Sequence, residues 1–107
     1  IIGDICEIRA LKKVFGDHLY KIKINATKSL IGHALGASGA LELITTVLAI
    51  KSGKIHTTIN IEDPDDEIKD INIVCNRYQN CDIKNALSNS FGFGGHNCVL
   101  VISKYAY

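Results

Sequence analysis

The sequence predicts an α/β fold in which a mixed sheet carries a helix on its face. Two observations lead to this prediction. The hydrophobic patterns run in the order helix, strand, long apolar helix and then several short strands. The long helix, Gly36 to Lys51, is apolar around nearly its whole circumference, as helices covered on more than one side are. Because no other pattern in the chain supplies the outer cover, we expect that layer to come from another part of the polypeptide or from another chain.

Two elements are predicted ahead of the long helix. An amphipathic helix runs from Asp4, its expected N-cap, to Phe15, since apolar residues recur there at helical spacing. A strand from Tyr20 to Ile24 follows, because apolar residues alternate there with lysines.

The long helix is predicted to end at Ser52-Gly53. Inside it, Gly36 and Gly39 each weaken a helix by roughly 0.5–1 kcal/mol relative to alanine. Their presence predicts a neighbour that approaches the helix closely at both positions.

The second half of the chain is predicted to consist mostly of strands. After an extended segment from Ile55 to Ile61, the acidic run Glu62 to Glu67 is expected to be a solvated loop, because it lacks the glycine and the spacing of a calcium loop. The strand candidates are Ile71 to Cys75, Ile83 to Asn89 and Cys98 to Ser103. The glycine-rich segment Phe91 to His96 predicts a hairpin between the last two.

The composition fits a single domain and excludes several classes of partner. The 107 residues carry a net charge of +1, with both signs spread along the chain, so no nucleic-acid partner is predicted. The longest apolar run, Gly39 to Ile50, is interrupted by Glu42 and is too short to cross a bilayer, so no membrane partner is predicted either. The cysteines show no CxxC or zinc-site spacing and are expected to be free, mostly buried thiols in a reducing compartment, cytoplasm or plastid: Cys6, Cys75, Cys81 and Cys98.

The stretch around His33 concentrates groups that could carry chemistry. His33 lies just ahead of the long helix, where the positive end of the helix dipole disfavours an imidazolium. A neutral histidine there can donate a hydrogen bond to a developing oxyanion, although a purely structural histidine is the alternative. Lys28 and Glu42 flank it and could pair in the folded state. The glycine-rich segments lack the phosphate-binding patterns, and no cofactor is predicted.

Two separated motifs carry a family resemblance. KSLIGHALGASG, residues 28–39, precedes the apolar helix that contains Glu42, and SNSFGFGGHN, residues 88–97, lies near the C-terminus. Both resemble motifs of the elongating beta-ketoacyl-acyl-carrier-protein synthases, the condensing enzymes of type II fatty acid synthesis. The opening residues 3–16 are similar to the same family, so the resemblance covers nearly the whole chain. Polyketide-type ketosynthases share a related motif, but residues 35–39 resemble the fatty-acid type more closely.

This resemblance implies a thiolase-like fold of five alternating layers of helix and sheet, with residues 1–107 forming part of its C-terminal half. The implied reaction is a decarboxylative Claisen condensation between an acyl group on a cysteine and malonyl-acyl-carrier protein. His33 matches the second catalytic histidine, which stabilises the malonyl enolate. Lys28 matches the active-site lysine, and Glu42 matches the glutamate beside it.

The second motif implies a loop that moves. Phe93 matches the gatekeeper phenylalanine, whose backbone N–H helps to form the oxyanion hole for the acyl thioester. The neighbours implied to let this loop switch are Phe91, Gly92, Gly94 and Gly95. In some members of the family, a structural monovalent cation lies near positions that match Glu42, Ser88 and Asn89.

Other parts of the family's active site have no match in the chain. The nucleophilic cysteine belongs to the upstream half, and the first catalytic histidine belongs to a motif just ahead of Gly3, so the chain alone is predicted to be inactive. Ser38 stands where alanine is common, and His96 stands where threonine is frequent. His18 and His56 match no motif and are expected to be surface or loop residues.

The implied partners are acyl-acyl-carrier protein, malonyl-acyl-carrier protein and, in the full-length enzyme, a second copy in a homodimer. The alternatives are a non-catalytic subunit like a chain-length factor, and a small binding module. Lys28 and His33 favour the enzyme, because a subunit without catalysis has no chemical need for them. The apolar long helix argues against the module.

Overall fold

The structure is a computed structural model, and it describes residues 2–106. The helices are α1 (Ile2–Phe15), α2 (Lys28–Ile31) and α3 (Ser38–Ser52), and the strands are β1 (Lys54–Ile55), β2 (Gln79–Asn80), β3 (Asn85–Phe91) and β4 (Asn97–Ser103). Short 3-10 turns complete the regular structure: η1 (Gly16–Lys21), η2 (Leu35–Ala37), η3 (Asp66–Ile68) and η4 (Phe93–Gly95).

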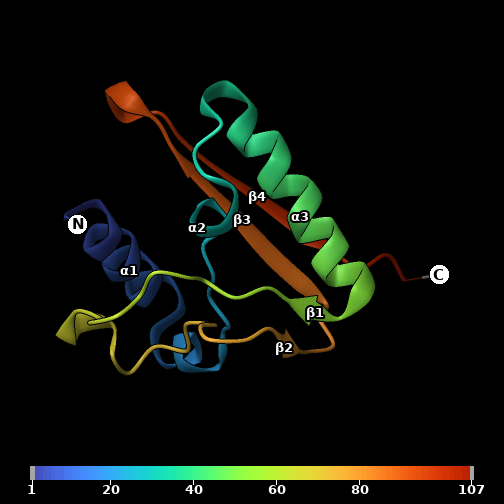
Figure 1. The fold of residues 1–107 in the computed structure, drawn as a ribbon, viewed down its shortest axis with the longest axis horizontal. Coiled ribbons are helices and arrows are strands. Elements are labelled where there is room, and N and C mark those ends of the chain that lie inside the picture. The colour runs from blue at the N-terminus through green and yellow to red at the C-terminus, as the bar shows by residue number, and fades with distance from the viewer. Residues whose placement is uncertain (1, 107) are drawn as a thin grey trace.

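Helix α3 and the β3–β4 hairpin form the larger layer pair. The strands pair antiparallel, from Asn85 opposite Ser103 to Phe91 opposite Asn97, and α3 packs along them (Figure 1). The predicted α/β class, the long helix and this hairpin are therefore confirmed. The predicted single mixed sheet is wrong, because β1 and β2 form a separate antiparallel pair.

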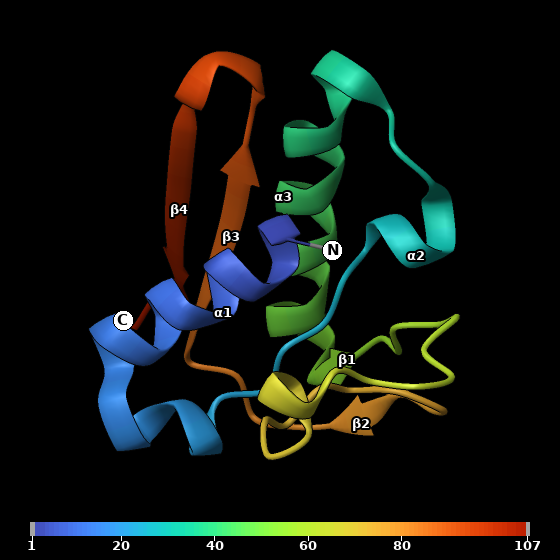
Figure 2. The ribbon, with the colours of Figure 1, turned by 90° about the vertical axis from the view of Figure 1, so that its left-hand side faces the viewer.

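The second part of the fold surrounds a small core beneath α1. Ile8 of α1, Leu19 of η1 and Ile71 are buried together (Figure 2 shows α1 and η1 side by side). The predicted strand from Tyr20 to Ile24 is wrong, because residues 16–21 form a 3-10 turn that buries Leu19 completely. Only Ile24 makes a strand-like contact, an isolated parallel bridge to Ile73.

Other boundaries also differ from the predictions. Helix α1 already includes Ile2, so Asp4 lies within its first turn and is not its N-cap. The segments predicted as extended or as a strand, 55–61 and 71–75, keep only isolated parallel bridges beyond β1, such as Thr58 to Cys75. The acidic run is not simply a solvated loop, because Glu67 at its end binds Arg9 of α1.

Among the glycines in and next to α3, Gly53 at its C-terminal end has the close neighbour within residues 2–106. Gly53 ends α3 in the left-handed region with φ of +67°, and a Cβ there would lie 3.2 Å from the carbonyl oxygen of Cys81. Within residues 2–106, a Cβ at Gly36 would meet nothing within 4 Å, and one at Gly39 would make only an ordinary contact with Ser90. The close approach predicted at these two positions is therefore not made by the described residues.

Apolar side chains remain exposed on both members of the larger layer pair. They include Leu41, Ile44, Val47 and Leu48 of α3 and Val99, Leu100 and Val101 of β4. A strand that is apolar on both faces is typical of a sheet covered on both sides. Although α3 packs on the hairpin, these side chains remain exposed within residues 2–106. An additional outer layer, as predicted for the long helix, would cover them.

The stretch Leu35–Ser52 corrects the expectation that the apolar run is too short to cross a bilayer. It has 18 residues with a mean hydropathy of 1.3, so by length and composition alone it is sufficient for a membrane span, and 11% of it is buried. Its packing on the hairpin and the ion pair of Glu42 with Lys28 are typical of a core helix. The absence of a membrane partner stays a prediction.

The thiols are free, as predicted, but they are not mostly buried. Cys6 and Cys98 are exposed, and Cys75 and Cys81 are partly buried.

Candidate active site

Lys28 and Glu42 form an ion pair between two helices. Lys28 is the first residue of α2, and its Nζ donates a hydrogen bond to Glu42 Oε1 in the second turn of α3. The Lys28 side chain is 42% exposed and that of Glu42 is 13% exposed. The pairing predicted from the sequence is confirmed. It links α2 to α3, the helices that precede and follow the loop that carries His33.

His33 lies in that loop, between α2 and η2, and its ring has a defined hydrogen-bonding direction. The backbone N–H of Leu35 donates to His33 Nδ1 at 2.9 Å. Leu35 itself has φ of +51°, a conformation that L-residues rarely adopt. Since Nδ1 accepts a hydrogen bond, a neutral His33 carries its hydrogen on Nε2. His33 is exposed, so Nε2–H is available to a ligand.

A network behind α2 holds Lys28 in place. His56 Nδ1–H donates to the carbonyl of Thr57 at 3.0 Å, so in the neutral ring His56 Nε2 accepts from the hydroxyl of Thr27 at 3.0 Å. The hydroxyl of Ser29, two residues after Thr27, accepts from the backbone N–H of Ile59 at 3.1 Å. His56 lies in a loop, as predicted, and the structure adds its contact with Thr27. No local sequence signal reveals its contact with Thr27, because the two residues are far apart along the chain.

The hairpin turn presents Phe93 fully to solvent, and Phe91 is about half exposed. Gly92 N–H donates to the carbonyl of His96 at 2.7 Å, which closes the turn. Gly94 has φ of +80°, where a side chain would be strained. Gly95 has φ of +81°. In both views the turn and η2 lie at the same end of the molecule (Figures 1 and 2).

The described hydrogen bonds and ion pairs do not join this turn to His33. The two predicted parts of the site thus share one end of the fold, and the roles given to Phe91, Gly92, Phe93, Gly94 and Gly95 stay predictions.

The three cation candidates have other partners or surroundings. Glu42 is bound to Lys28, Asn89 Nδ2 donates to Glu7 Oε1 at 3.1 Å, and Ser88 is buried in β3. Among residues 2–106, no group of three or more His, Cys, Asp or Glu side chains is placed to hold a metal ion. The monovalent cation near Glu42, Ser88 and Asn89 stays a prediction.

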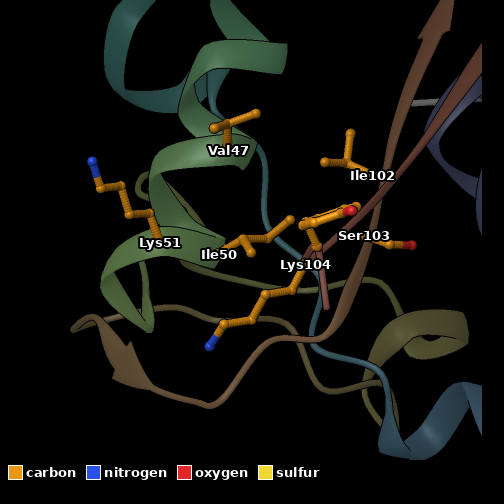
Figure 3. Close-up of a pocket in the computed structure, with 7 residues that line it drawn as sticks. Val47, Ile50, Lys51, Ile102, Ser103 and Lys104 are labelled. Atoms are coloured by element: carbon orange, nitrogen blue, oxygen red, sulfur yellow. The ribbon is translucent and has the colours of Figure 1, made fainter. Parts of the chain in front are cut away.

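A hollow of about 310 Å³ lies between the last turns of α3 and the end of β4 (Figure 3). Val47 and Ile50 form part of its lining on the helix, and Ile102 and Lys104 on the hairpin side. None of the predicted site residues lines it. It lies at the end of α3 remote from His33, so it is not part of the candidate site.

The chain is similar to known proteins over most of its length. Residues 1–62 match the family model described as beta-ketoacyl synthase, C-terminal domain. A 3-oxoacyl-[acyl-carrier-protein] synthase 2 of Coxiella burnetii is 50% identical over 95% of this chain and 24% of its own length. The Staphylococcus aureus (strain COL) protein of the same name is 47% identical over 97% of this chain and 25% of its own length. The chain thus spans about a quarter of the length of these curated relatives.

Solved structures show the same fold. A type II polyketide synthase acyl-carrier protein in complex with its ketosynthase contains a chain that superposes with a TM-score of 0.88 at 37% identity, over 92% of this chain and 24% of that chain. The ishigamide ketosynthase/chain length factor gives a TM-score of 0.88 at 36% identity, over 96% of this chain and 25% of that chain. The predicted thiolase-like ketosynthase fold is therefore confirmed. The chain belongs to the family of the beta-ketoacyl synthase C-terminal domain.

Proposed function

We propose that this chain is part of a beta-ketoacyl-acyl-carrier-protein synthase, which extends fatty acids by decarboxylative Claisen condensation. The observation that carries the proposal is the hydrogen bond from Leu35 N–H to His33 Nδ1, since it leaves Nε2–H as an exposed donor. The identity of 47% and 50% to proteins named 3-oxoacyl-[acyl-carrier-protein] synthase 2 supports the same reaction class.

His33 would act on the malonyl thioester. Its Nε2–H donates to the thioester carbonyl oxygen, which becomes negatively charged as the bond to the carboxylate breaks and carbon dioxide leaves. The hydrogen bond is therefore stronger in the transition state than in the ground state, which is the condition for it to accelerate the reaction.

The electron pair left on the malonyl carbon then attacks the acyl carbonyl on the nucleophilic cysteine, and the cysteine thiolate leaves. Lys28, oriented by Glu42, supplies fixed positive charge beside this chemistry. The turn that carries Phe93 would form the oxyanion hole for the acyl carbonyl and gate access to it.

In this proposal residues 1–107 form part of a C-terminal thiolase-like domain, and the nucleophilic cysteine lies in an N-terminal half outside them. That half, or a second copy in a homodimer, would cover the exposed apolar side chains of α3 and β4. Acyl-acyl-carrier protein and malonyl-acyl-carrier protein would deliver the two substrates.

The second candidate is a polyketide-type ketosynthase or a non-catalytic subunit like a chain-length factor. The fold similarity to the ishigamide ketosynthase/chain length factor favours it. Against both stands the higher identity to the 3-oxoacyl synthases. The presence of His33 and Lys28 argues further against a subunit without catalysis.

The test is release of carbon dioxide from malonyl-acyl-carrier protein in the presence of an acyl primer. A chimera in which residues 1–107 replace the matching part of the Staphylococcus aureus enzyme should release it, and the 107-residue chain alone should not. His33→Ala in the chimera should lower the rate by about 10²–10³, the usual effect of losing one oxyanion donor. His18→Ala is the matched control, since His18 is exposed in η1 and should leave the rate unchanged. Turnover by the chain alone, or full activity of His33→Ala, would refute the proposal.

A further inference from the structure

The hydroxyl of Ser38 lies against the ring of His33, although the proposed mechanism gives Ser38 no task. Ser38 Oγ is 3.2 Å from His33 Nδ1. Ser38 is the first residue of α3, and it is buried. Its hydroxyl is therefore held by the helix in a fixed position beside the imidazole.

Two neighbouring hydrogen bonds decide which of these atoms is the donor. Ala34 N–H donates to Ser38 Oγ at 2.9 Å, so this oxygen already accepts one hydrogen bond. Leu35 N–H donates to His33 Nδ1 at 2.9 Å, so Nδ1 does not carry a hydrogen of its own. The arrangement consistent with these bonds has the Ser38 hydroxyl donating to Nδ1, whose single lone pair it shares with the Leu35 N–H, while it accepts from Ala34.

We propose that Ser38 is a positioning residue, which holds His33 in the tautomer with its hydrogen on Nε2 and fixes the plane of the ring. A hydroxyl suits this place because it combines one donor with two acceptor lone pairs, so it can bind the backbone and the ring at once. The tautomer does not depend on the reaction. Only its consequence for catalysis, a correctly aimed Nε2–H, rests on the proposed function.

The test reads the tautomer directly. Long-range ¹H–¹⁵N correlation spectra of the ¹⁵N-labelled chain, recorded at alkaline pH where histidine is neutral, show which ring nitrogen carries the hydrogen. His33 in the unsubstituted chain should be in the Nε2–H form. Ser38→Ala should lower the ratio of Nε2–H to Nδ1–H about threefold to tenfold, which corresponds to the loss of one neutral hydrogen bond. The Leu35 N–H remains, so the shift should be partial.

Two variants separate this role from a loss of helix structure. Ser38→Thr keeps the hydroxyl and should keep the ratio of the unsubstituted chain. Ser52→Ala removes an exposed hydroxyl from the other end of the same helix and should change nothing. An unchanged ratio in Ser38→Ala, or an equal fall in Ser52→Ala, would overturn the proposal.

If the amide signals of Ser38→Ala lose their chemical-shift dispersion, that variant is unfolded. Ser38→Cys then tests the proposal in its place. It keeps the size of the side chain while replacing the hydroxyl by a weak donor, so the ratio should fall there too. An unchanged ratio in Ser38→Cys would overturn the proposal.

The chimera supplies a second readout. There Ser38→Ala should lower kcat for carbon dioxide release about threefold to tenfold, by loss of one hydrogen bond, with KM for malonyl-acyl-carrier protein unchanged. If the unsubstituted chimera releases no carbon dioxide while the tautomer ratio still falls in Ser38→Ala, the proposed function fails and the positioning role of Ser38 stands.

Discussion

Lys28 and Glu42 stand 14 positions apart in the sequence and form an ion pair that joins the first residue of α2 to α3, with His33 on the loop between them. The pair is asymmetric in its exposure, since the Glu42 side chain is mostly buried and the Lys28 side chain is not. Because the loop is fastened at both ends, its conformation at His33 is restricted before any ligand arrives.

The first prediction concerns this pair. Glu42→Gln keeps the shape of the side chain and removes its charge, and it should lower the free energy of unfolding by about 1 kcal/mol, the upper range for partly exposed ion pairs. The loss should shrink at high salt, because salt screens the exposed part of the attraction. Urea unfolding at low and high ionic strength measures both. Asp66→Asn, which breaks the exposed Lys69–Asp66 pair, is the control and should have almost no effect. Equal losses in the two variants would contradict the importance of burial at Glu42.

The second prediction is a pH dependence from Arg9 and Glu67. The Arg9 guanidinium donates two hydrogen bonds to the Glu67 carboxylate, at 2.6 and 3.0 Å, and these bonds hold the pKa of Glu67 below its ordinary value. A lowered pKa in the folded state contributes stability that is complete above the unfolded pKa, about 4.3, and is lost as the pH falls through the lower folded value. The stability difference between the unsubstituted chain and Glu67→Gln should therefore be present at neutral pH and vanish in acid.

Urea midpoints measured from neutral to strongly acidic pH check this. Glu62→Gln is the control, since Glu62 lies in the same acidic run but outside the Arg9 pair, and its difference from the unsubstituted chain should not follow that course. A Glu67→Gln difference that grows in acid would have the wrong sign.

The third prediction concerns the end of α3. Gly53→Ala places a Cβ on a residue with φ of +67° and 3.2 Å from the Cys81 carbonyl oxygen. It should lower the free energy of unfolding by about 1–2 kcal/mol, the cost of a left-handed L-residue. Gly3→Ala is the matched control, because a Cβ at Gly3 in α1 meets nothing within 4 Å and should be neutral or slightly stabilising. Thermal unfolding compares the two, and a neutral Gly53→Ala would show that the turn relaxes without cost.

The fourth prediction concerns Thr27 and His56. Thr27→Val removes the hydroxyl that binds His56 Nε2 at 3.0 Å and should cost about 1 kcal/mol of stability, the usual value for a hydrogen bond. Thr27→Ser keeps the hydroxyl and should cost less. A double-mutant cycle with His56→Gln isolates the interaction. Additive effects of Thr27→Val and His56→Gln would show that the two side chains are not coupled.

The fifth prediction concerns the uncovered hairpin. The isolated chain should self-associate in light scattering, because β4 presents apolar side chains and an unpaired edge within residues 2–106. Val101→Lys should reduce this association. Val14→Lys is the matched control, since Val14 is 74% exposed on α1 and Val101 is 70% exposed on β4. A monodisperse monomer of the unsubstituted chain would contradict the prediction.

Local sequence patterns predicted the structure correctly where the pattern belongs to a single helix or turn. The run from Gly36 to Lys51 and the glycine-rich turn of residues 91–96 correctly predict α3 and the β3–β4 hairpin. They fail between residues 16 and 24, where alternation indicates a strand. There the burial of Leu19 beneath α1 stabilises a 3-10 turn, and packing outweighs the local pattern.

The sequence by itself determined the family, the long apolar helix with its need for cover, and Lys28, His33 and Glu42 as candidate site residues. These follow from residue types and short spacings, which are properties of the chain alone. Only the tertiary structure decided that His33 Nδ1 accepts from Leu35 and lies beside the Ser38 hydroxyl, and that His56 contacts Thr27. The physical reason is that hydrogen-bond partners and tautomers depend on where backbone groups point after packing, and no periodicity in a sequence encodes that direction.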